Sequence, residues 1–531
     1  MSNGTVAMNA TMNVADFLLA SKDPDRVALR FSDADYTYGD LESVSFGIAQ
    51  FLVSAGGRKG DRAILLSENS FFWVVAYLGV LRAGMVAVPL PPDISQNDLH
   101  YIVQTTGATI ALLQSRLAAK YKSALTGILL STEQIAKDLA AGRGLTDARS
   151  IQTKKNTSGI IFPEVSSDDL AAFMFTSGST GRPRGVMVSH GNIVANTTSI
   201  VESLRLREND IIMTVLPFHY CFGTSLLHTH LRVGGTLVID LRFMYPEVVL
   251  QRMQETECTG FAGVPSHYQI LLRSSSLKKK AFPHLRYFQQ AGGHLAPSFI
   301  RELREALPNI QMFVMYGQTE ATARLACLSP ESLDSKPGSV GKAIPGVTLR
   351  ILSELGSEVK PGEIGEIVAE GQNVARGYWN APEESAVCFR DGRLYTGDLA
   401  TVDHEGFIYV VDRARDFVKC GGRRVSCRQL EDHLLEFDGI LEVAVIGVPD
   451  EILGEAVRAF VVPRDSQVNA LESQLRLFCK ARMSSQLIPR EFVILDTLPK
   501  NNSGKVLRQQ LKSAPVNSIA SPRDRVESSA L

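Results

Sequence analysis

The sequence lacks the features that mark secreted, metal-binding and membrane-spanning proteins. Seven cysteines are scattered over 531 residues without a Cys-x-x-Cys pair, which argues against a zinc knuckle and favours free thiols in a reducing compartment. No basic segment followed by an apolar run opens the chain, so we expect no signal peptide. The longest apolar segment, Phe72 to Leu90, is interrupted by Arg82 and Gly84, which favours a buried helix and strand over a transmembrane segment. We therefore expect a cytoplasmic protein.

A surplus of charge is also missing. The 55 basic and 56 acidic side chains leave a net charge of -1, so nothing in the electrostatics points to nucleic acid or an anionic membrane as partner. The length and a hydrophobic content of 45% suffice for at least two domains with substantial cores. Small molecules are the expected partners.

Glycine and hydroxyl residues are concentrated in one stretch, Thr176 to Gly185. The apolar run Leu170 to Phe175 before it predicts a buried strand, and Val186 to Val188 predicts a second strand that leads into a capped helix. Glycines let the backbone approach an anion closely, and the hydroxyl and guanidinium groups add directional donors. The composition suits a polyphosphate, although a flexible surface loop shares it, and no Lys-Ser or Lys-Thr closes the stretch as in a Walker A loop.

The pattern Thr-Ser-Gly-Ser-Thr-Gly-x-Pro-x-Gly resembles the signature loop of the adenylate-forming superfamily, which includes acyl- and aryl-CoA synthetases, adenylation domains and beetle luciferases. Arg184 stands where that family usually has lysine, and the two cations differ in geometry. The resemblance assigns nucleotide binding in this loop to Thr176, Ser177, Gly178, Ser179, Thr180, Gly181 and Arg184.

Alternating helix and strand patterns between residues 13 and 116 predict a mostly parallel sheet with helices on both faces. The resemblance implies an α/β fold with a large N-terminal domain of two doubly wound α/β subdomains plus a small β-barrel-like subdomain, followed by a mobile α+β C-terminal domain. The expected boundaries are 1–412 for the adenylation domain with its β-rich part at about 338–411, 413–416 for a hinge, 417–512 for the C-terminal lid domain and 513–531 for a disordered tail.

Three further motifs resemble the nucleotide-binding parts of the family. Gly292 and Gly293 lie in a Gly-Gly turn that would pack on the adenine. In Tyr316-Gly317-Gln318-Thr319-Glu320, Tyr316 would lie against the purine, Thr319 would donate to the α-phosphate and Glu320 would hold Mg²⁺. A simple helix cap, with Thr319 at the N-cap, would explain the Thr-Glu pair on structural grounds alone. Asp398 in Tyr-Thr-Gly-Asp would accept both ribose hydroxyls.

Two motifs resemble the moving parts of the family. In the stretch from Val411 to Gly422, Arg413 would bind ribose or phosphate, Arg415 would be the hinge, and Lys419, Gly421 and Gly422 would serve the thiol tunnel. Lys505 in Pro-Lys-Asn-Asn-Ser-Gly-Lys matches the catalytic lysine. By composition alone, a charged linker and a loop lysine are ordinary solvated features.

The resemblance also implies that the segment after the strand at Asp210 to Val215 lines the pocket for the acid. It holds no acidic residue from Pro217 to Thr224, so an amino acid's ammonium group would lack a partner there and an apolar acid is favoured. His228 and His230 form a lone His-x-His, which we interpret as ordinary packing rather than a metal site. The candidate pocket residues are His219, Tyr220, Phe222, Gly263 and Gly292.

These motifs together predict an AMP-forming, ATP- and Mg²⁺-dependent ligase that converts a fatty or other apolar carboxylic acid to acyl-AMP and then passes it to CoA. A ligase that loads the phosphopantetheine of an acyl carrier protein shares the same motifs. A luciferase-type oxygenase and an amino-acid-activating enzyme are less favoured. A non-catalytic nucleotide-binding protein is disfavoured because Glu320, Asp398, Arg413 and Lys505 are all retained.

Overall fold

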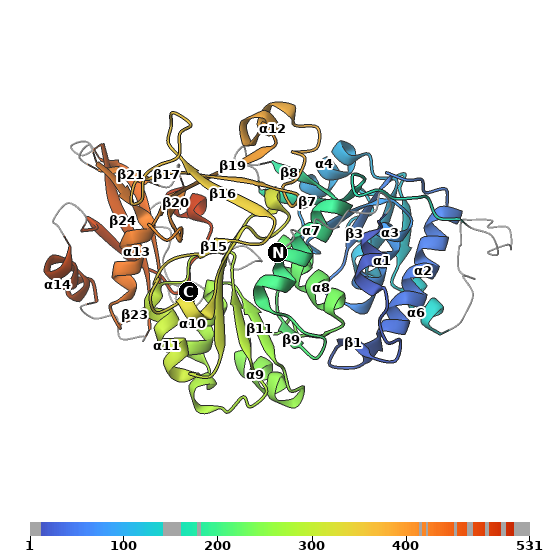
Figure 1. Cartoon of the computed structure of the whole chain (residues 1–531), viewed down its shortest axis with the longest axis horizontal. Coiled ribbons are helices and arrows are strands. Elements are labelled where there is room, and N and C mark those ends of the chain that lie inside the picture. The colour runs from blue at the N-terminus through green and yellow to red at the C-terminus, as the bar shows by residue number, and fades with distance from the viewer. Residues whose placement is uncertain are drawn as a thin grey trace, which may run out of the picture.

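The computed structural model describes residues 12–141, 161–177, 182–413, 417–420, 423–450, 454–464, 471–483, 488–500 and 506–513. The fold is mixed α/β, with a large N-terminal domain and a smaller C-terminal domain, drawn in orange and red in Figure 1. This confirms the predicted fold class. The domain boundaries stay a prediction.

The first sheet of the large domain has six strands in the order β6-β5-β3-β4-β7-β8, and all neighbours are parallel except β7 and β8. Its strands are β3 Arg62–Leu66, β4 Val86–Leu90, β5 Ile110–Leu113, β6 Leu129–Thr132, β7 Leu170–Ser177 and β8 Pro183–Ser189. One face packs against α2 (Tyr38–Ser54), α3 (Phe71–Arg82) and α6 (Gln134–Ala140), and the other packs against α4 (Gln96–Thr106) and α5 (Ser115–Ala118).

The second sheet has nine strands in the order β15-β14-β13-β12-β11-β9-β10-β1-β2. Its strands are β1 Val27–Arg30, β2 Asp35–Thr37, β9 Ile211–Thr214, β10 Thr236–Ile239, β11 Gly260–Gly263, β12 Tyr287–Gln290, β13 Gln311–Tyr316, β14 Ala326–Leu328 and β15 Lys342–Ala343. Helices α1 (Val14–Leu19), α7 (His190–Leu204) and α8 (Cys221–Val233) pack on one face, and α9 (Pro246–Glu255), α10 (Pro265–Ser274) and α11 (Pro297–Ala306) pack on the other.

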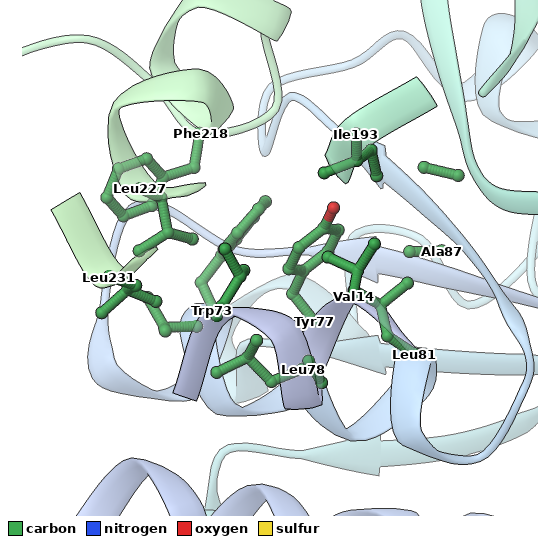
Figure 2. Close-up of a cluster of buried hydrophobic side chains, with 14 of the residues drawn as sticks. Val14, Trp73, Tyr77, Leu78, Leu81, Ala87, Ile193, Phe218, Leu227 and Leu231 are labelled. Atoms are coloured by element: carbon green, nitrogen blue, oxygen red, sulfur yellow. The ribbon is translucent and has the colours of Figure 1, made fainter. Parts of the chain in front are cut away.

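One apolar core joins the two sheets. Every residue of α3 is buried, and Figure 2 shows Trp73 and Tyr77 of this helix among Phe218, Leu227 and other side chains of the second half. The apolar segment that begins at Phe72 is therefore a buried helix followed by a strand, as predicted. Among the described residues, no helix is long and apolar enough to cross a membrane.

An antiparallel sheet follows within the range where the sequence predicted short strands. Its five strands are β16 Val347–Leu352, β17 Gly365–Gly371, β18 Phe389–Arg390, β19 Arg393–Val402 and β20 Ile408–Arg413, with the short helix α12 (Pro382–Cys388) inserted before β18. Strand β19 pairs with β17, β18 and β20. This arrangement places Asp398 of β19 directly opposite Arg413 of β20.

The small domain has its own core and its own sheet, in the order β22-β21-β24-β23 with β25 beside β24. The strands are β21 Phe417–Cys420, β22 Arg423–Ser426, β23 Ile440–Asp450, β24 Gly454–Pro463 and β25 Glu491–Ile494, and the helices are α13 Cys427–Leu435, α14 Leu471–Arg482 and α15 Arg508–Ser513. Leu435 of α13 also packs against the core of the second sheet of the large domain.

Candidate nucleotide and acid site

The stretch predicted to bind phosphate, Thr176 to Gly185, includes the end of β7 and the start of β8, which pair as antiparallel neighbours. Thr176 and Arg184 lie opposite each other in the register of the two strands. The Thr176 hydroxyl and the Arg184 Nε are both buried and have no hydrogen-bond partner within the part of the chain that the structure describes. Buried polar atoms normally find a partner, so a ligand bound here would complete them. Gly178, Ser179, Thr180 and Gly181 lie outside the described residues, and so does the side chain of Ser177.

Tyr378 connects this hairpin to the Thr-Glu motif, and sequence reasoning missed it. Its backbone pairs with Val186 of β8, which seats the ring beneath Arg184 with the guanidinium carbon 4.6 Å from the ring centroid. The Tyr378 hydroxyl donates a hydrogen bond to Glu320 Oε1 over 2.7 Å. Burial and the neighbouring Glu320 carboxylate raise the pKa of Tyr378, so the phenol remains protonated and remains a donor.

The Thr-Glu motif is a short 3₁₀ turn, Thr319–Ala321. Gln318, not Thr319, occupies the cap position and makes no capping bond with its side chain, so the explanation of this pair as a helix cap is wrong. The Thr319 hydroxyl instead donates to Cys221 Sγ over 3.3 Å. The Gln318 Nε2 is buried without a partner, a third such atom besides those of the hairpin.

These residues fit a nucleotide with Mg²⁺. No cluster of three metal-ligating side chains occurs among the described residues. Glu320 would therefore share the ion with phosphate and water oxygens, which is how Mg²⁺ is usually held beside a polyphosphate.

The ribose and purine residues also converge. The Tyr316 hydroxyl, at the end of β13, donates to Asp398 Oδ2 of β19 over 2.6 Å. Gly292 has φ +82°, which favours glycine. Gly317 lies so close to the backbone of Ala323 that a side chain there would collide with it. The turns around the proposed adenine site therefore require glycine at these two positions.

We call Pro217 to Thr224, the segment expected to line the pocket for the acid, the acid segment. It runs into the first turn of α8. His219 and Phe222 are buried, and burial lowers the pKa of His219 to about 4. The rings of His219 and Tyr220 lie 4.4 Å apart. A Cβ on Gly292 would lie 4.0 Å from Phe222 Cδ1, which places this turn beside the acid segment.

Gly263 differs from the expectation. A Cβ there would approach the Cβ of His267 and a ring carbon of Phe261 to 3.0 Å each. A side chain at this position would therefore meet the protein's own packing around α10. The assignment of Gly263 to the acid pocket stays a prediction.

His228 and His230 are core residues. His228 Nε2 bonds to the Tyr77 hydroxyl and His230 Nε2 bonds to the Tyr287 hydroxyl, each over 3.0 Å. The interpretation of this pair as packing residues is confirmed.

The small domain meets the large one at the Gly-Gly turn. His294 Nε2 bonds to Asp432 Oδ1 of α13 over 2.7 Å, and Arg428 of α13 donates to His294 Nδ1. Burial lowers the pKa of His267 in α10 to about 4, and the positive charge of Lys500 lowers it further, so the segment that leads to Lys505 lies near α10. Lys505, Arg415, Gly421 and Gly422 lie outside the described residues, as do the side chains of Arg413 and Lys419.

Comparison with models of protein families identifies the family to which the chain belongs. The AMP-binding enzyme model matches residues 19–379, and the AMP-binding enzyme C-terminal domain matches residues 429–505. The chain belongs to the AMP-binding enzyme family.

Relatives of known activity agree with the family. A feruloyl-CoA synthase from Amycolatopsis sp is 31% identical over 498 residues, which cover 93% of this chain and 96% of the relative. A long-chain-fatty-acid–CoA ligase from Bacillus subtilis is 29% identical over 526 residues, covering 93% and 92%. Among solved structures, ATP-bound MatB from Rhodopseudomonas palustris matches with a TM-score of 0.84 and 30% identity, covering 94% of this chain and 98% of that one. Membership assigns this AMP-binding enzyme to the ATP-dependent acid–CoA ligases.

Proposed function

We propose that this AMP-binding enzyme activates a carboxylic acid that has no α-amino group and transfers it to CoA, and that the residues named above carry the two steps. The observation that supports the proposal best is the convergence of Thr176, Arg184, Tyr378 and Glu320, because it leaves buried donors unsatisfied where a triphosphate would lie. A cytoplasmic location is proposed as well, supported by seven free cysteines.

In the first step the carboxylate oxygen attacks the α-phosphorus of ATP, and the bond to pyrophosphate breaks. No general base is needed because the nucleophile is already ionised, so the protein's task is to position the reactants and to stabilise charge. Thr319 and Lys505 would donate to the α-phosphate, while Arg184 and the Thr176 hydroxyl would bind the other phosphates. A Mg²⁺ ion on Glu320 would neutralise phosphate charge.

The nucleoside would be held by the same turns that depend on glycine. Asp398 would accept the ribose hydroxyls with Arg413 opposite it, and Gly292, Gly293, Tyr316 and Gly317 would contact the adenine.

In the second step the CoA thiol attacks the carbonyl carbon of the acyl-AMP, and AMP leaves. We propose that the small domain rotates about Arg415 between the steps, so that Lys505 withdraws and Lys419, Gly421 and Gly422 line the thiol tunnel. The contact of His294 with Asp432 and Arg428 would hold the first orientation.

The division of labour is tested with two lysine variants. Lys505→Ala should abolish adenylate formation but leave thioester formation from a pre-made acyl-AMP intact, and Lys419→Ala should do the reverse. If each variant slows both steps equally, the alternation of the small domain is wrong.

The acid wall consists of His219, Tyr220 and Phe222 with the Gly292 turn. From Pro217 to Thr224 it offers no carboxylate for an ammonium group, which supports an acid without an α-amino group. The test is acid-dependent ATP–pyrophosphate exchange over a panel of fatty acids, aryl acids, dicarboxylic acids and amino acids. CoA and a holo acyl carrier protein are then offered to the adenylate that forms. An amino acid as best substrate, or transfer to the carrier protein alone, would contradict the proposal.

A further inference from the structure

One cation beside the acid wall has no counterion among the residues that the structure describes. Arg324 is only 2% exposed, and its guanidinium carbon lies 4.6 Å from the centroid of the Phe222 ring. Its Nε and Nη2 atoms are buried and have no hydrogen-bond partner. Two N–H donors of the planar guanidinium group are thus buried without an acceptor among the described residues.

Among the described residues, no carboxylate acts on the pKa of Arg324. Burial lowers the pKa of Arg324 to about 10, so it stays charged at neutral pH, and the groups that act to raise it again are the thiols of Cys221 and Cys327. Burial raises the pKa of Cys327 to about 12 and also raises that of Cys221, so both thiols are neutral at physiological pH. A buried cation without a partner is costly, and stacking on an aromatic ring offsets only part of that cost.

The backbone that carries this side chain is held by buried hydrogen bonds. Asn196 accepts a hydrogen bond from the Arg324 amide, and Asn196 and Asn373 both donate to the Arg324 carbonyl, over 2.9 and 3.0 Å. Both asparagines are buried. Thr322, two residues before Arg324, has φ +66°, a strained backbone conformation for a β-branched residue. The protein therefore holds an unpaired guanidinium in place.

The held guanidinium lies at the acid pocket. Phe222, on which it stacks, belongs to the acid segment, and Cys221 beside it accepts the hydrogen bond of Thr319. A cavity lies against the same wall and is lined by Cys221, Ala323 and Asn196 among others. The cation is thus close to the expected position of the acyl group.

We propose that Arg324 determines the substrate class by binding a second anionic group on the acid, in the simplest case the distal carboxylate of a dicarboxylic acid. The inference rests on the proposed function and refines it, because the wall without acidic residues had favoured a fully apolar acid. A guanidinium suits this role because its fork matches the two oxygens of a carboxylate.

The test compares matched acids in ATP–pyrophosphate exchange: adipic acid, its monomethyl ester and hexanoic acid, and likewise terephthalic and benzoic acid. The wild-type enzyme should prefer the diacid over its mono-acid partner by at least tenfold in kcat/KM in one of the series. Arg324→Met should lose about 100-fold with that diacid, through a higher KM for the acid, while the KM for ATP stays the same. Arg324→Lys should recover part of the loss.

A second readout separates ligand binding from a purely structural role. Because the unpaired cation is costly, ligand-free Arg324→Met should be at least as stable as the wild type in thermal unfolding, and the diacid alone should raise the Tm of the wild type only. Arg232→Met is the matched control. Arg232 also stacks on an aromatic ring, that of Phe17 at 4.4 Å, but it donates to the Phe17 carbonyl and lies at the other end of α8.

The outcomes are distinct. If no acid supports exchange, the proposed function itself fails. If a mono-acid is preferred in every series and Arg324→Met keeps wild-type kinetics, the proposed function stands and the assignment of Arg324 is overturned. Should Arg324→Met not fold, the selectivity of the wild type and of Arg324→Lys between the matched acids decides.

Discussion

The hydroxyl of Tyr378 donates a hydrogen bond to Glu320 over 2.7 Å, and the guanidinium of Arg184 lies over the ring of the same tyrosine. The ring is held there by backbone pairing, because the amide of the next residue, Trp379, donates to the Gly185 carbonyl of β8 over 2.8 Å. One aromatic side chain therefore joins the phosphate hairpin to the carboxylate that we propose for Mg²⁺.

Tyr378→Phe should raise the Mg²⁺ concentration needed for half-maximal pyrophosphate exchange by about tenfold, since a hydrogen bond to a charged group contributes about 1.5–3 kcal/mol and orients the carboxylate. The measurement is a Mg²⁺ titration at saturating ATP. Tyr121→Phe is the control, because the Tyr121 hydroxyl donates to backbone carbonyls of Pro92 and Ile94 instead. Equal Mg²⁺ dependence in the two variants would refute the positioning role.

Arg184→Lys should cost at most a few-fold in the first step. The charge is kept, and the stacking on Tyr378 that is altered contributes about 0.5–1 kcal/mol at a partly exposed site. Single-turnover adenylate formation measures the effect. A loss beyond about 100-fold, or about 2.7 kcal/mol in the barrier, would show that the guanidinium makes a bidentate contact with the phosphates.

Thr176→Val should raise the KM for ATP about tenfold without lowering the Tm. The buried Thr176 hydroxyl has no hydrogen-bond partner among the described residues, so its removal should cost the ligand-free fold little. Thr236→Val should lower the Tm and leave the KM for ATP unchanged, because the Thr236 hydroxyl donates to the Val27 carbonyl over 2.7 Å in the sheet. A drop in Tm for Thr176→Val at an unchanged KM for ATP would show that the Thr176 hydroxyl stabilises the fold and does not bind ATP.

The enzyme should lose stability on mild acidification. Burial lowers the pKa of His228 to about 3 and those of His190, His219, His230 and His267 to about 4. Unfolded histidine titrates near 6.5, so below that pH the unfolded state binds more protons and the free energy of unfolding falls. Each buried histidine should cost about 1.4 kcal/mol at pH 5.5 relative to pH 8.

Urea unfolding at pH 8 and pH 5.5 measures this loss. His228→Gln can keep a bond to Tyr77 but cannot titrate, so its pH-dependent loss should be smaller by about that amount. Stability that stays constant between the two pH values would mean that these histidines are not held neutral.

The sequence predicted the elements whose signals are local. The capped helix after the phosphate loop is α7, where Ser189 and Asn192 form a reciprocal capping box. The buried helix α3 and the strands around Thr176 also followed from short apolar runs. The order of the elements along the chain was misleading only where a strand pairs with a strand that is distant in the sequence. The hairpin β1–β2 lies on the second sheet, beside β10, although the next strand in the chain, β3, belongs to the first sheet.

The site residues that sequence reasoning missed depend on distant contacts. Tyr378 meets Glu320 from 58 positions away, and His294 meets Asp432 from 138 positions away. Arg324 follows the Thr-Glu motif closely, yet nothing in its sequence context says that its guanidinium is buried without a counterion. That property depends on which side chains of α8 lie opposite.

The central claim is that the acid's own oxygen becomes attached to the α-phosphate before CoA attacks. The most direct test is a complete reaction with the preferred acid labelled with ¹⁸O in both carboxylate oxygens, followed by mass analysis of the nucleotide product. Attack on the α-phosphorus, followed by cleavage of the acyl C–O bond by the thiol, leaves one ¹⁸O atom in AMP and none in pyrophosphate. Unlabelled AMP, or ADP together with labelled inorganic phosphate, would contradict the acyl-adenylate route.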